Sequence, residues 1–542
     1  MERKTEVITI SLWQAFAALL TLLPLLFLNI SAFTGNTDAL FYTIILKLTA
    51  HHMAQGEMWP GWLSEANGAT GSPVLFFYSR LACQLTAILG APLAFIDPLG
   101  WKRLVLGMFA AQWVGGMAAW MWLSRFGSRR AALVASVLFT LFPYKWIYIY
   151  LHINLAQLWA LAWLPPLMMA AEDMRDGKRA APVWYGLWLG LLALTHPPTL
   201  VAFGAVPAIY VLVFSRKRLA ELASAHLVAL ALSACYWLPA LLNKSLVQAG
   251  QFTREQWNYA GNLSHYDLLL NFHYAVIAAL VIGLMLHGRQ MREHKRELFW
   301  LAALGVVTFL CLRISRPLWD VVTPLQFLQF PAARFHAVAL MAACALTVFC
   351  IDCVHKPSRL YSLPVLLGAV AVMTIFDLHY VYGIYKRPTD INAHYIEQVH
   401  ALDLIVPQEY LTRWQPRNAG SLARAASNSE LPLAFIAHGT GSASAYVADN
   451  GEIHIRADIL SPEALLQVRQ LYWPGWRSSG VAPEAGADGF LTLRLPQGRQ
   501  SLTLSMGALA GEFAGGLISL LGWLAMLLFF CAEWTRDSRR MP

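Results

Sequence analysis

The chain has 542 residues, of which 57% are hydrophobic and only 13% are charged. Soluble domains carry about 25% charged residues, so this composition excludes an ordinary soluble protein of several domains. The net charge of +9 would suit nucleic-acid binding only on a soluble module with a basic face and interleaved aromatics, and the sequence contains no such module. We therefore attribute the positive charge to the cytoplasmic loops of an integral membrane protein.

Apolar runs long enough to cross a membrane recur along the chain. A hydrocarbon core about 30 Å thick is crossed by about 20 apolar residues in a helix. The first run follows the N-terminal MERKTEV. It is longer than the core of a signal peptide and has no clear small-residue cleavage site, so we predict an uncleaved first span. We predict about twelve spans, at residues 8–30, 100–123, 131–150, 154–172, 182–196, 198–215, 222–243, 268–287, 297–313, 335–354, 360–381 and 511–532.

Lysine and arginine gather in the connections that lie on one side of the membrane when the N-terminus is inside. Such an excess marks the cytoplasmic side. We therefore predict a multi-pass protein with both termini in the cytoplasm. The basic connections are RFGSRR (125–130), EDMRDGKR (172–179), SRKR (215–218), HGRQMREHKRE (287–297), HKPSR (355–359) and the tail RDSRR (536–540).

The apolar run Ser72–Ile96 does not fit this alternation. Counting it as a span would place RFGSRR outside, and the run contains Arg80, which costs roughly 2.5 to 3.5 kcal/mol at a bilayer centre. We predict a horizontal or re-entrant helix on the outer face, with a thirteenth span as the alternative.

The segment before the last span has a different composition, with more polar residues and turns such as DNG and PEAGADG. Alternation with a period of two at Ile453–Ala457 and Leu491–Leu495 predicts strands. We expect a small β-rich domain at about 430–506, preceded by a helical linker. Its PGW turn should bury Trp473 and Trp476 in the domain core, with an acceptor-facing role as the alternative.

These elements divide the chain into three parts. Residues 1–381 form a transmembrane domain that includes a first outer loop at 31–96. Residues 382–510 form an extracytoplasmic linker and β-rich domain, and residues 511–542 form a last helix and a cytoplasmic tail.

The first outer loop contains the leading candidate for chemistry. Asp38 follows the first span and precedes an apolar segment, 39–53, that we expect to be an amphipathic helix at the membrane interface. A carboxylate there can deprotonate a hydroxyl or hold a metal, although an N-cap or solvated residue is the alternative. His52 and the following Glu57 suit hydrogen bonds to sugar hydroxyls or an interfacial position.

Further cationic and imidazole side chains lie near the predicted outer ends of spans. Ionisable groups at membrane depth are costly and usually face a cavity. The alternative for each group is that its side chain extends to the outer surface. Arginine binds phosphate through two parallel hydrogen bonds and lysine acts as a point charge, so these groups are candidates for a phosphate or pyrophosphate site: Arg80, Lys145 and Arg334, with His152 and His196 near them. The sequence contains no phosphate-binding loop, so it does not support a soluble nucleotide sugar as the donor.

Several of these segments resemble a known group of membrane proteins. Asp38 followed by GSPVLFFYSRL resembles the GT-C superfamily of membrane glycosyltransferases. LQFPAARF resembles the FPWRF-like element of its YfhO-like branch, which overlaps with membrane proteins described as related to pyruvoyl-tetrahydropterin synthase. LYWPGWRSSGVAPEAGADGFLTLRLPQGRQSLTLSM resembles the C-terminal signature of that branch, a PGW strand followed by a glycine loop and an LPxG strand.

The resemblance implies a GT-C-like α-helical polytopic membrane protein with about twelve helices and a small extracytoplasmic β-rich domain. Such a protein in the bacterial cytoplasmic (inner) membrane would transfer a hexosyl or pentosyl group from a polyprenyl-phosphate donor. The acceptor would be an envelope lipid, glycan or protein on the outer face. By the same resemblance Asp38 is the base or metal ligand and Arg334 a lipid-phosphate ligand, and we expect Lys145 to converge with them. The expected partners are donor, acceptor and membrane lipids, and not nucleic acid.

The sequence departs from that pattern in the first loop. GT-C enzymes often have paired acids here, whereas Thr37 and Ala39 flank Asp38, and FPWRF has become FPAARF. We therefore leave the cofactor open, with a divalent metal as one alternative. The rival function is a non-catalytic GT-C-like lipid-carrier binding protein, transporter or scaffold in envelope glycan assembly. Transporters usually show paired halves with interrupted helices, and the chain shows no such symmetry.

Overall fold

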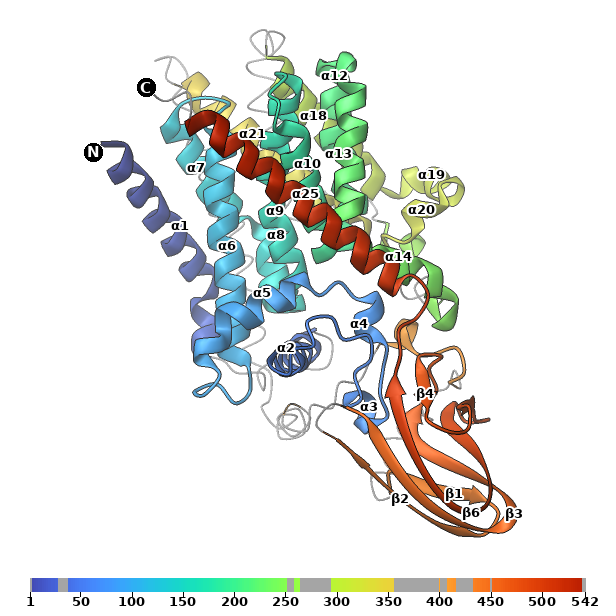
Figure 1. Ribbon diagram of the computed structural model, residues 1–542. Coiled ribbons are helices and arrows are strands. Elements are labelled where there is room, and N and C mark those ends of the chain that lie inside the picture. Colours follow the sequence, from blue (N-terminus) through green and yellow to red (C-terminus); the bar gives the residue numbers. More distant parts are fainter. Residues whose placement is uncertain are drawn as a thin grey trace.

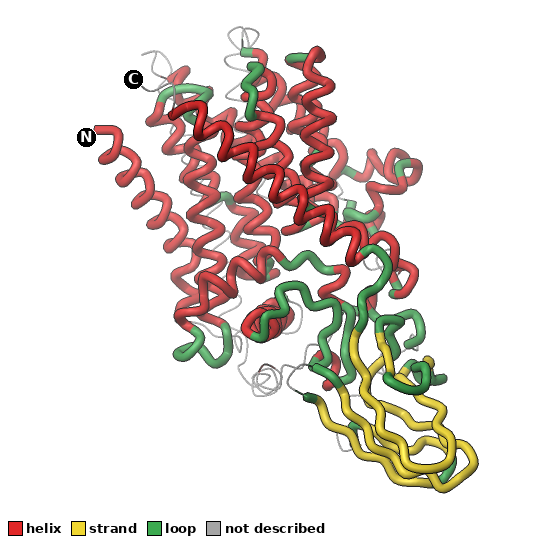
Figure 2. Tube along the Cα trace, in the orientation of Figure 1, coloured by secondary structure: helices red, strands yellow, loops and turns green. Residues whose placement is uncertain are grey.

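A bundle of helices and an antiparallel sheet occupy opposite ends of the molecule in the computed structural model (Figure 1). The structure describes residues 2–27, 38–250, 258–263, 294–354, 399, 407–415, 432–448 and 451–538. Both termini lie at the end of the bundle away from the sheet (Figure 1). Loops and short helices fill the region where bundle and sheet meet (Figure 2).

All ten predicted spans that fall within the described residues are helical, and the spans at 268–287 and 360–381 lie outside those residues. Six described helices are long and apolar enough to cross a membrane, and a seventh span results if α13 and α14, bent by 75°, count as one. The main helices are α1 (Glu2–Phe27), α6 (Trp101–Leu123), α7 (Arg129–Leu141), α9 (Leu155–Arg175), α10 (Ala181–Thr195), α11 (Pro197–Phe203), α12 (Ala205–Phe214), α13 (Leu219–Leu232), α14 (Ala234–Asn243), α18 (Lys295–Cys311), α21 (Pro331–Val354) and α25 (Glu512–Ser538).

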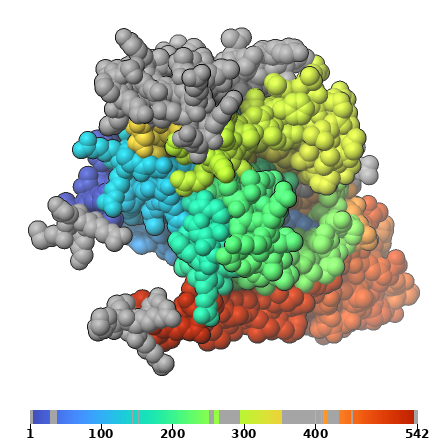
Figure 3. Space-filling view, turned by 90° about the horizontal axis from the view of Figure 1, so that it is seen from above, coloured from blue at the N-terminus to red at the C-terminus, as the bar shows by residue number. Residues whose placement is uncertain are grey.

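Small residues allow these helices to approach closely, as is usual inside membranes. A Cβ at Gly116 of α6 would lie 2.2 Å from the side chain of Gln14 and 2.6 Å from that of Thr140, so only glycine lets α1 and α7 pack here. The last helix, α25, runs along the outer edge of the bundle (Figure 3) and packs on α13 and α14. Its remaining apolar surface faces outward, as expected of a helix in contact with lipid.

The described parts of several predicted cytoplasmic connections contact other segments at one end of the bundle. Arg129 pairs with Glu6, Arg125 pairs with Asp173 at 2.8 Å, and the Ser128 hydroxyl donates to Asp352 at 2.6 Å. Because these contacts join segments from across the sequence at the end opposite the sheet, the arrangement agrees with the predicted alternation of loops. The compartment that each end faces stays a prediction.

The Ser72–Ile96 segment forms α4 (Val74–Phe77), α5 (Leu81–Gly90) and the short η2 (Ala91–Leu93). Its apolar helical stretch Leu81–Leu93 extends about 20 Å at 1.5 Å per residue, which is too short for a hydrocarbon core of about 30 Å. It lies at the sheet-bearing end of the bundle (Figure 1) and packs on α2 (Ala39–Ala54) and α6. This agrees with the prediction that the segment does not cross the membrane.

The segment after Asp38 forms the predicted helix, α2 (Ala39–Ala54), which runs across the direction of the bundle helices at the sheet-bearing end (Figure 1). The expectation that it is amphipathic, with one face in water, is wrong. Tyr42, Ile44, Ile45 and Leu48 point in different directions around the helix, and all of them are buried. A helix that is apolar all round is buried, and α5 and neighbouring segments cover this one.

Six strands form the sheet in the order β1-β3-β6-β4, with β2 also paired to β3 and β5 to β6. The predicted strands at 453–457 and 491–495 lie within the two long central strands. The linker predicted before the domain falls almost entirely outside the described residues. The strands are β1 (Ala434–His438), β2 (Gly441–Val447), β3 (Ile453–Leu471), β4 (Trp476–Ser478), β5 (Glu484–Ala485) and β6 (Phe490–Met506).

The core of the sheet is completed by the first outer loop. Trp473 and Trp476 are buried, which confirms their predicted core position. Trp62 of the loop stacks on Trp473 with ring centres 6.2 Å apart and meets Trp476 edge-on at 6.0 Å. The Leu471 N–H also donates to the Thr70 carbonyl at 2.7 Å. The loop therefore attaches the sheet to the end of the bundle where Asp38 lies.

Candidate functional site

Asp38 and Arg334, far apart in sequence, come together at the sheet-bearing end of the bundle. Asp38 precedes α2, where its carbonyl accepts from the Tyr42 N–H at 2.8 Å and its own N–H donates to the His152 carbonyl at 3.1 Å. Arg334 lies in the first turn of α21. The guanidinium is close enough to lower the pKa of Asp38, yet no ion pair joins these two described side chains. Their charges therefore interact without a direct ion pair.

The Asp38 carboxyl group is only partly hydrated. The residue is exposed to solvent, but burial by the surrounding protein is the largest influence on its pKa and raises it to about 6, while Arg334 opposes the rise and Glu409 adds to it. A carboxylate with a pKa near 6 is a better proton acceptor near neutral pH than an ordinary aspartate.

Arg334 offers a positive charge with an unused donor. Its Nη1 donates to Gln157 Oε1 at 3.2 Å. Its buried Nε has no hydrogen-bond partner in the described part of the chain. The guanidinium also acts electrostatically on His152 and His196. Burial and the charge of Arg334 both lower the pKa of His152, so this imidazole is neutral at pH 7. Arg334 therefore keeps one guanidinium donor without a partner among the described residues.

A strained turn connects these groups. It follows a π-helical turn, η3 (Ile147–His152), and contains Ile153 in the left-handed region with φ of 52°. Asn154 then caps α9, because its Oδ1 accepts from the Gln157 N–H at 2.9 Å. The same oxygen accepts from the Tyr42 hydroxyl at 2.9 Å, and that hydroxyl lies 2.5 Å from the hydroxyl of Tyr78. The turn therefore links α2, which begins at Asp38, to the glutamine that holds Arg334.

Among the predicted site residues, the structure brings together Asp38, His152, His196 and Arg334. His196 ends α10 and accepts from the Thr199 N–H at 3.2 Å, with its Nδ1 2.7 Å from the Thr199 hydroxyl.

Lys145 is not part of this group, so the expectation that it converges with Asp38 and Arg334 is wrong. Its buried amine donates to Gln112 Oε1 at 2.8 Å and lies 3.9 Å from the centre of the Phe139 ring. The position of Lys145 near the end of a predicted span indicates how deep the residue lies in the membrane. It does not indicate that the side chain points into the bundle, toward Gln112 and Phe139.

Arg80 lies in a different environment from Arg334. Its Nη1 donates to the Pro60 carbonyl at 2.9 Å, and its guanidinium lies 4.4 Å from the centre of the Trp59 ring. These contacts hold the first outer loop against the start of α5, so we do not include Arg80 in the phosphate site.

His52 and Glu57 form a third group, at the opposite end of α2 from Asp38. His52 Nδ1 lies 2.7 Å from Glu57, and its Nε2 lies 3.6 Å from Glu65. Although burial acts against it, the hydrogen bond to Glu57 and the nearby negative charge of Glu65 raise the pKa of His52 to about 9. The histidine is therefore a cation that ties the helix end to the following loop.

Sequence reasoning missed Tyr42, Tyr78, Gln157 and Glu409. Tyr42 carried a signal, because residues four apart share one face of a helix and it is four residues after Asp38. Gln157 and Glu409 carried none, because only the fold brings them to Arg334 and Asp38. No group of three or more histidine, cysteine or acidic side chains in the described ranges is placed to hold a metal ion.

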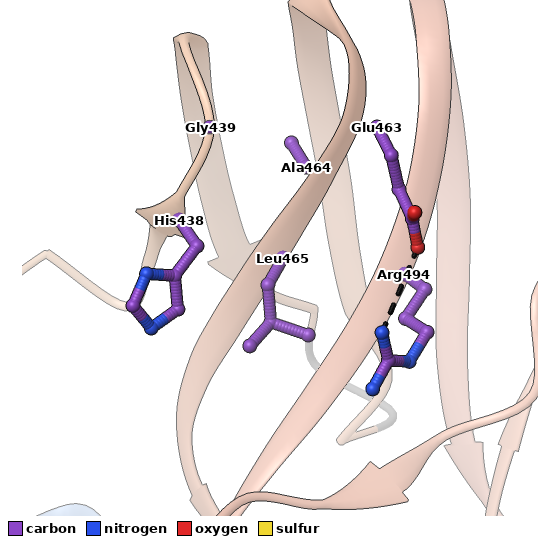
Figure 4. A pocket seen from close by; sticks show the side chains of 6 residues that line it. All are labelled: His438, Gly439, Glu463, Ala464, Leu465 and Arg494. Atoms are coloured by element: carbon purple, nitrogen blue, oxygen red, sulfur yellow. Dashed lines mark ion pairs between the residues drawn. The ribbon is translucent and has the colours of Figure 1, made fainter.

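A separate shallow pocket of about 370 Å³ lies on the sheet, and none of its residues was predicted as a site. Figure 4 shows the Arg494 guanidinium facing Glu463, 3.7 Å away. Glu484 also pairs with Arg494 at 3.1 Å, so this arginine is already neutralised. The pocket is lined by His438, Gly439, Glu463, Ala464, Leu465 and Arg494.

Comparisons with known proteins identify a family. No curated protein sequence matches the chain. Among solved structures, the archaeal oligosaccharyltransferase AglB from Archaeoglobus fulgidus, in complex with an inhibitory peptide and a dolichol-phosphate, is similar with a TM-score of 0.40 and 13% identity. The match covers 79% of this chain, which spans 60% of the length of AglB. Residues 74–381, more than half of the chain, match the model of the 6-pyruvoyl-tetrahydropterin synthase related domain, described as a membrane protein. The chain therefore belongs to this family of membrane proteins, which confirms the branch that its motifs resemble.

Proposed function

We propose that the protein is a membrane glycosyltransferase of the GT-C type. It would transfer a sugar from a polyprenyl-phosphate donor to an envelope lipid, glycan or protein at the sheet-bearing end of the bundle. The observation that carries the proposal is the pairing of Asp38, an accessible carboxylate with a raised pKa, with Arg334, a cation that has an unused donor. The two groups are neighbours without neutralising each other.

The reaction follows from these two groups. Asp38 removes the proton from an acceptor hydroxyl, which requires a distance of about 2.6 to 3.2 Å or one bridging water. The acceptor oxygen attacks the anomeric carbon, and the bond from that carbon to the phosphate oxygen breaks. The bonding electrons leave on the lipid phosphate, whose added negative charge Arg334 stabilises. The proton ends on Asp38 and the sugar on the acceptor.

The surroundings support this division of roles. Gln157 fixes the orientation of Arg334 through Nη1 and leaves Nε for a phosphate oxygen. The helix start at Asp38 is held by its bond to the His152 carbonyl. A base and a phosphate ligand on separate elements can contact two parts of the same bound substrate. Holding a substrate in a reactive position in this way contributes strongly to catalysis.

The decisive experiment is sugar transfer from polyprenyl-phosphate donors in liposomes, measured beside donor binding and a thermal melt. Asp38→Asn should abolish turnover and leave folding and donor binding largely intact. Arg334→Ala should mainly weaken donor binding. Asp176→Asn is the matched control, because this aspartate pairs with Arg175 at the opposite end of the bundle. Full transfer by Asp38→Asn would remove the catalytic assignment.

The second candidate is a protein that binds the lipid carrier without transferring sugar. It is favoured by the missing acid pair in the first loop. In that case the wild type would bind polyprenyl phosphate in an Arg334-dependent way, and no tested donor would be turned over.

A further inference from the structure

The amide of Asn154 has a fixed orientation. The Gln157 N–H and the Tyr42 hydroxyl both point at one side-chain atom of Asn154, each at 2.9 Å. A backbone N–H can only donate, so that atom must be the carbonyl oxygen Oδ1. The NH₂ group therefore faces the other way. Its two hydrogens have no acceptor among the residues that the structure describes, and the residue is half-buried.

Asn154 contacts both elements that form the proposed site. On one side it contacts Tyr42, in the first turn of the helix that begins at Asp38. On the other side it caps the helix start that carries Gln157, whose side chain holds Arg334. In a transfer reaction the moving sugar must lie between the base that activates the acceptor and the cation that binds the leaving phosphate. The hydrogen bonds of Asn154 connect the elements that carry these two groups.

The backbone around Asn154 is strained in a way that helix capping does not require. Ile153 is β-branched and has a φ of 52°, a conformation that costs of order 1–3 kcal/mol. The preceding turn is π-helical, and such turns occur frequently at functional sites. An ordinary helix start would supply the cap without this strain. What the strained turn adds is the placement of the His152 carbonyl against the Asp38 N–H and of the Asn154 side-chain oxygen against the Tyr42 hydroxyl.

We propose that Asn154 recognises the transferred sugar, with its NH₂ group donating to a hydroxyl oxygen of that sugar. This inference rests on the proposed function and adds a sugar-contacting residue to the base and the phosphate ligand. A neutral amide suits a hydroxyl better than a phosphate, because Arg334 already supplies the charge that a phosphate needs. An aspartate would cap α9 equally well, but it would place a second carboxylate near Asp38 and could not donate.

The test compares two lipids, polyprenyl phosphate without sugar and polyprenyl phosphate carrying one of a panel of hexoses and pentoses. The variant is Asn154→Ser, because serine retains the helix cap and lacks the amide donors. We expect its affinity for the best sugar-bearing lipid to fall about tenfold, the effect of one lost hydrogen bond. Its affinity for the bare lipid and its Tm should stay near those of the wild type. Asn258→Ser is the matched control, since Asn258 caps α15 (Tyr259–Asn262) through its side chain.

Equal losses for both lipids in Asn154→Ser would show a structural role only and overturn the inference. So would a wild type that binds no sugar-bearing lipid more tightly than bare polyprenyl phosphate. Failure of the proposed function is distinguishable, because it would leave a sugar preference that depends on Asn154 beside a transfer activity that is absent or independent of Asp38.

Discussion

Trp62 should be the residue of the first outer loop on which the sheet depends most. Its indole is 6% exposed and contacts Trp473 and Trp476, and its Nε1 donates to Gln470 Oε1 at 3.0 Å. Trp62→Ala removes an aromatic side chain that buries of order 200 Å², worth about 5 kcal/mol at 25 cal/mol per Å². Tryptophan-to-alanine changes in cores cost about 3–5 kcal/mol. We expect about 3–4 kcal/mol, because Gln470 still donates to the Ser64 and Ala69 carbonyls and keeps the loop partly attached.

Hydrogen exchange of the β3 and β6 amides measures this effect locally, which suits a large membrane protein whose global unfolding is not two-state. A loss of 3–4 kcal/mol lowers protection in these strands about 10²–10³-fold. Trp62→Phe should lose only about 1–2 kcal/mol, since it keeps a ring in the core and removes the hydrogen bond. Trp534→Ala is the control, because that side chain is 79% exposed. Unchanged protection in Trp62→Ala would refute the shared core.

Three further predictions concern pH and topology. Because Asp38 must be ionised to act as a base and its pKa is about 6, kcat/KM should fall about tenfold per pH unit below 6 and level off above it; a flat profile between pH 5 and 7 would exclude this base. The folded-state pKa of His52 is raised to about 9, so its stabilisation is complete below the unfolded pKa of about 6.5 and is lost as pH rises through 9. Because Glu57 is 51% exposed, solvent screening reduces the contribution of the His52 ion pair to the free energy of unfolding to about 1–2 kcal/mol. The Tm should therefore drop between pH 7 and 10 in the wild type but not in His52→Gln. Finally, the Ser478→Cys variant should react with a membrane-impermeant thiol reagent added from the outside. Reaction only from the cytoplasmic side would reverse the predicted topology.

Much of the fold could be predicted because apolar length and alternation are direct consequences of membrane thickness and strand geometry. The ten described spans and the strands around Ile453 and Leu491 follow from these patterns. The burial of α2 was missed because a short apolar helix beside a charged residue resembles an interfacial helix. Apolar residues on all sides of a helix indicate that it is buried rather than amphipathic.

The candidate site was less predictable than the fold. Asp38 and Arg334 could be selected from their places at span ends and from family motifs. The direction of Lys145 could not, because distance along a helix gives depth and not the face on which a side chain lies. Tyr78 resembles an ordinary core aromatic in sequence, and nothing in the sequence indicates the left-handed conformation of Ile153.

The shared core between the first outer loop and the sheet has a consequence for biosynthesis. Trp62 and its partner Gln470 are 408 residues apart. At about 5–20 residues per second, the ribosome makes the partner roughly 20–80 s after the tryptophan. During that interval the indole has no sheet to pack on, so the loop that carries the candidate base must be shielded by lipid or by a chaperone. The loop can reach its final position only when β3 and β6 have been made and folded, so the site is completed late in the synthesis of the chain.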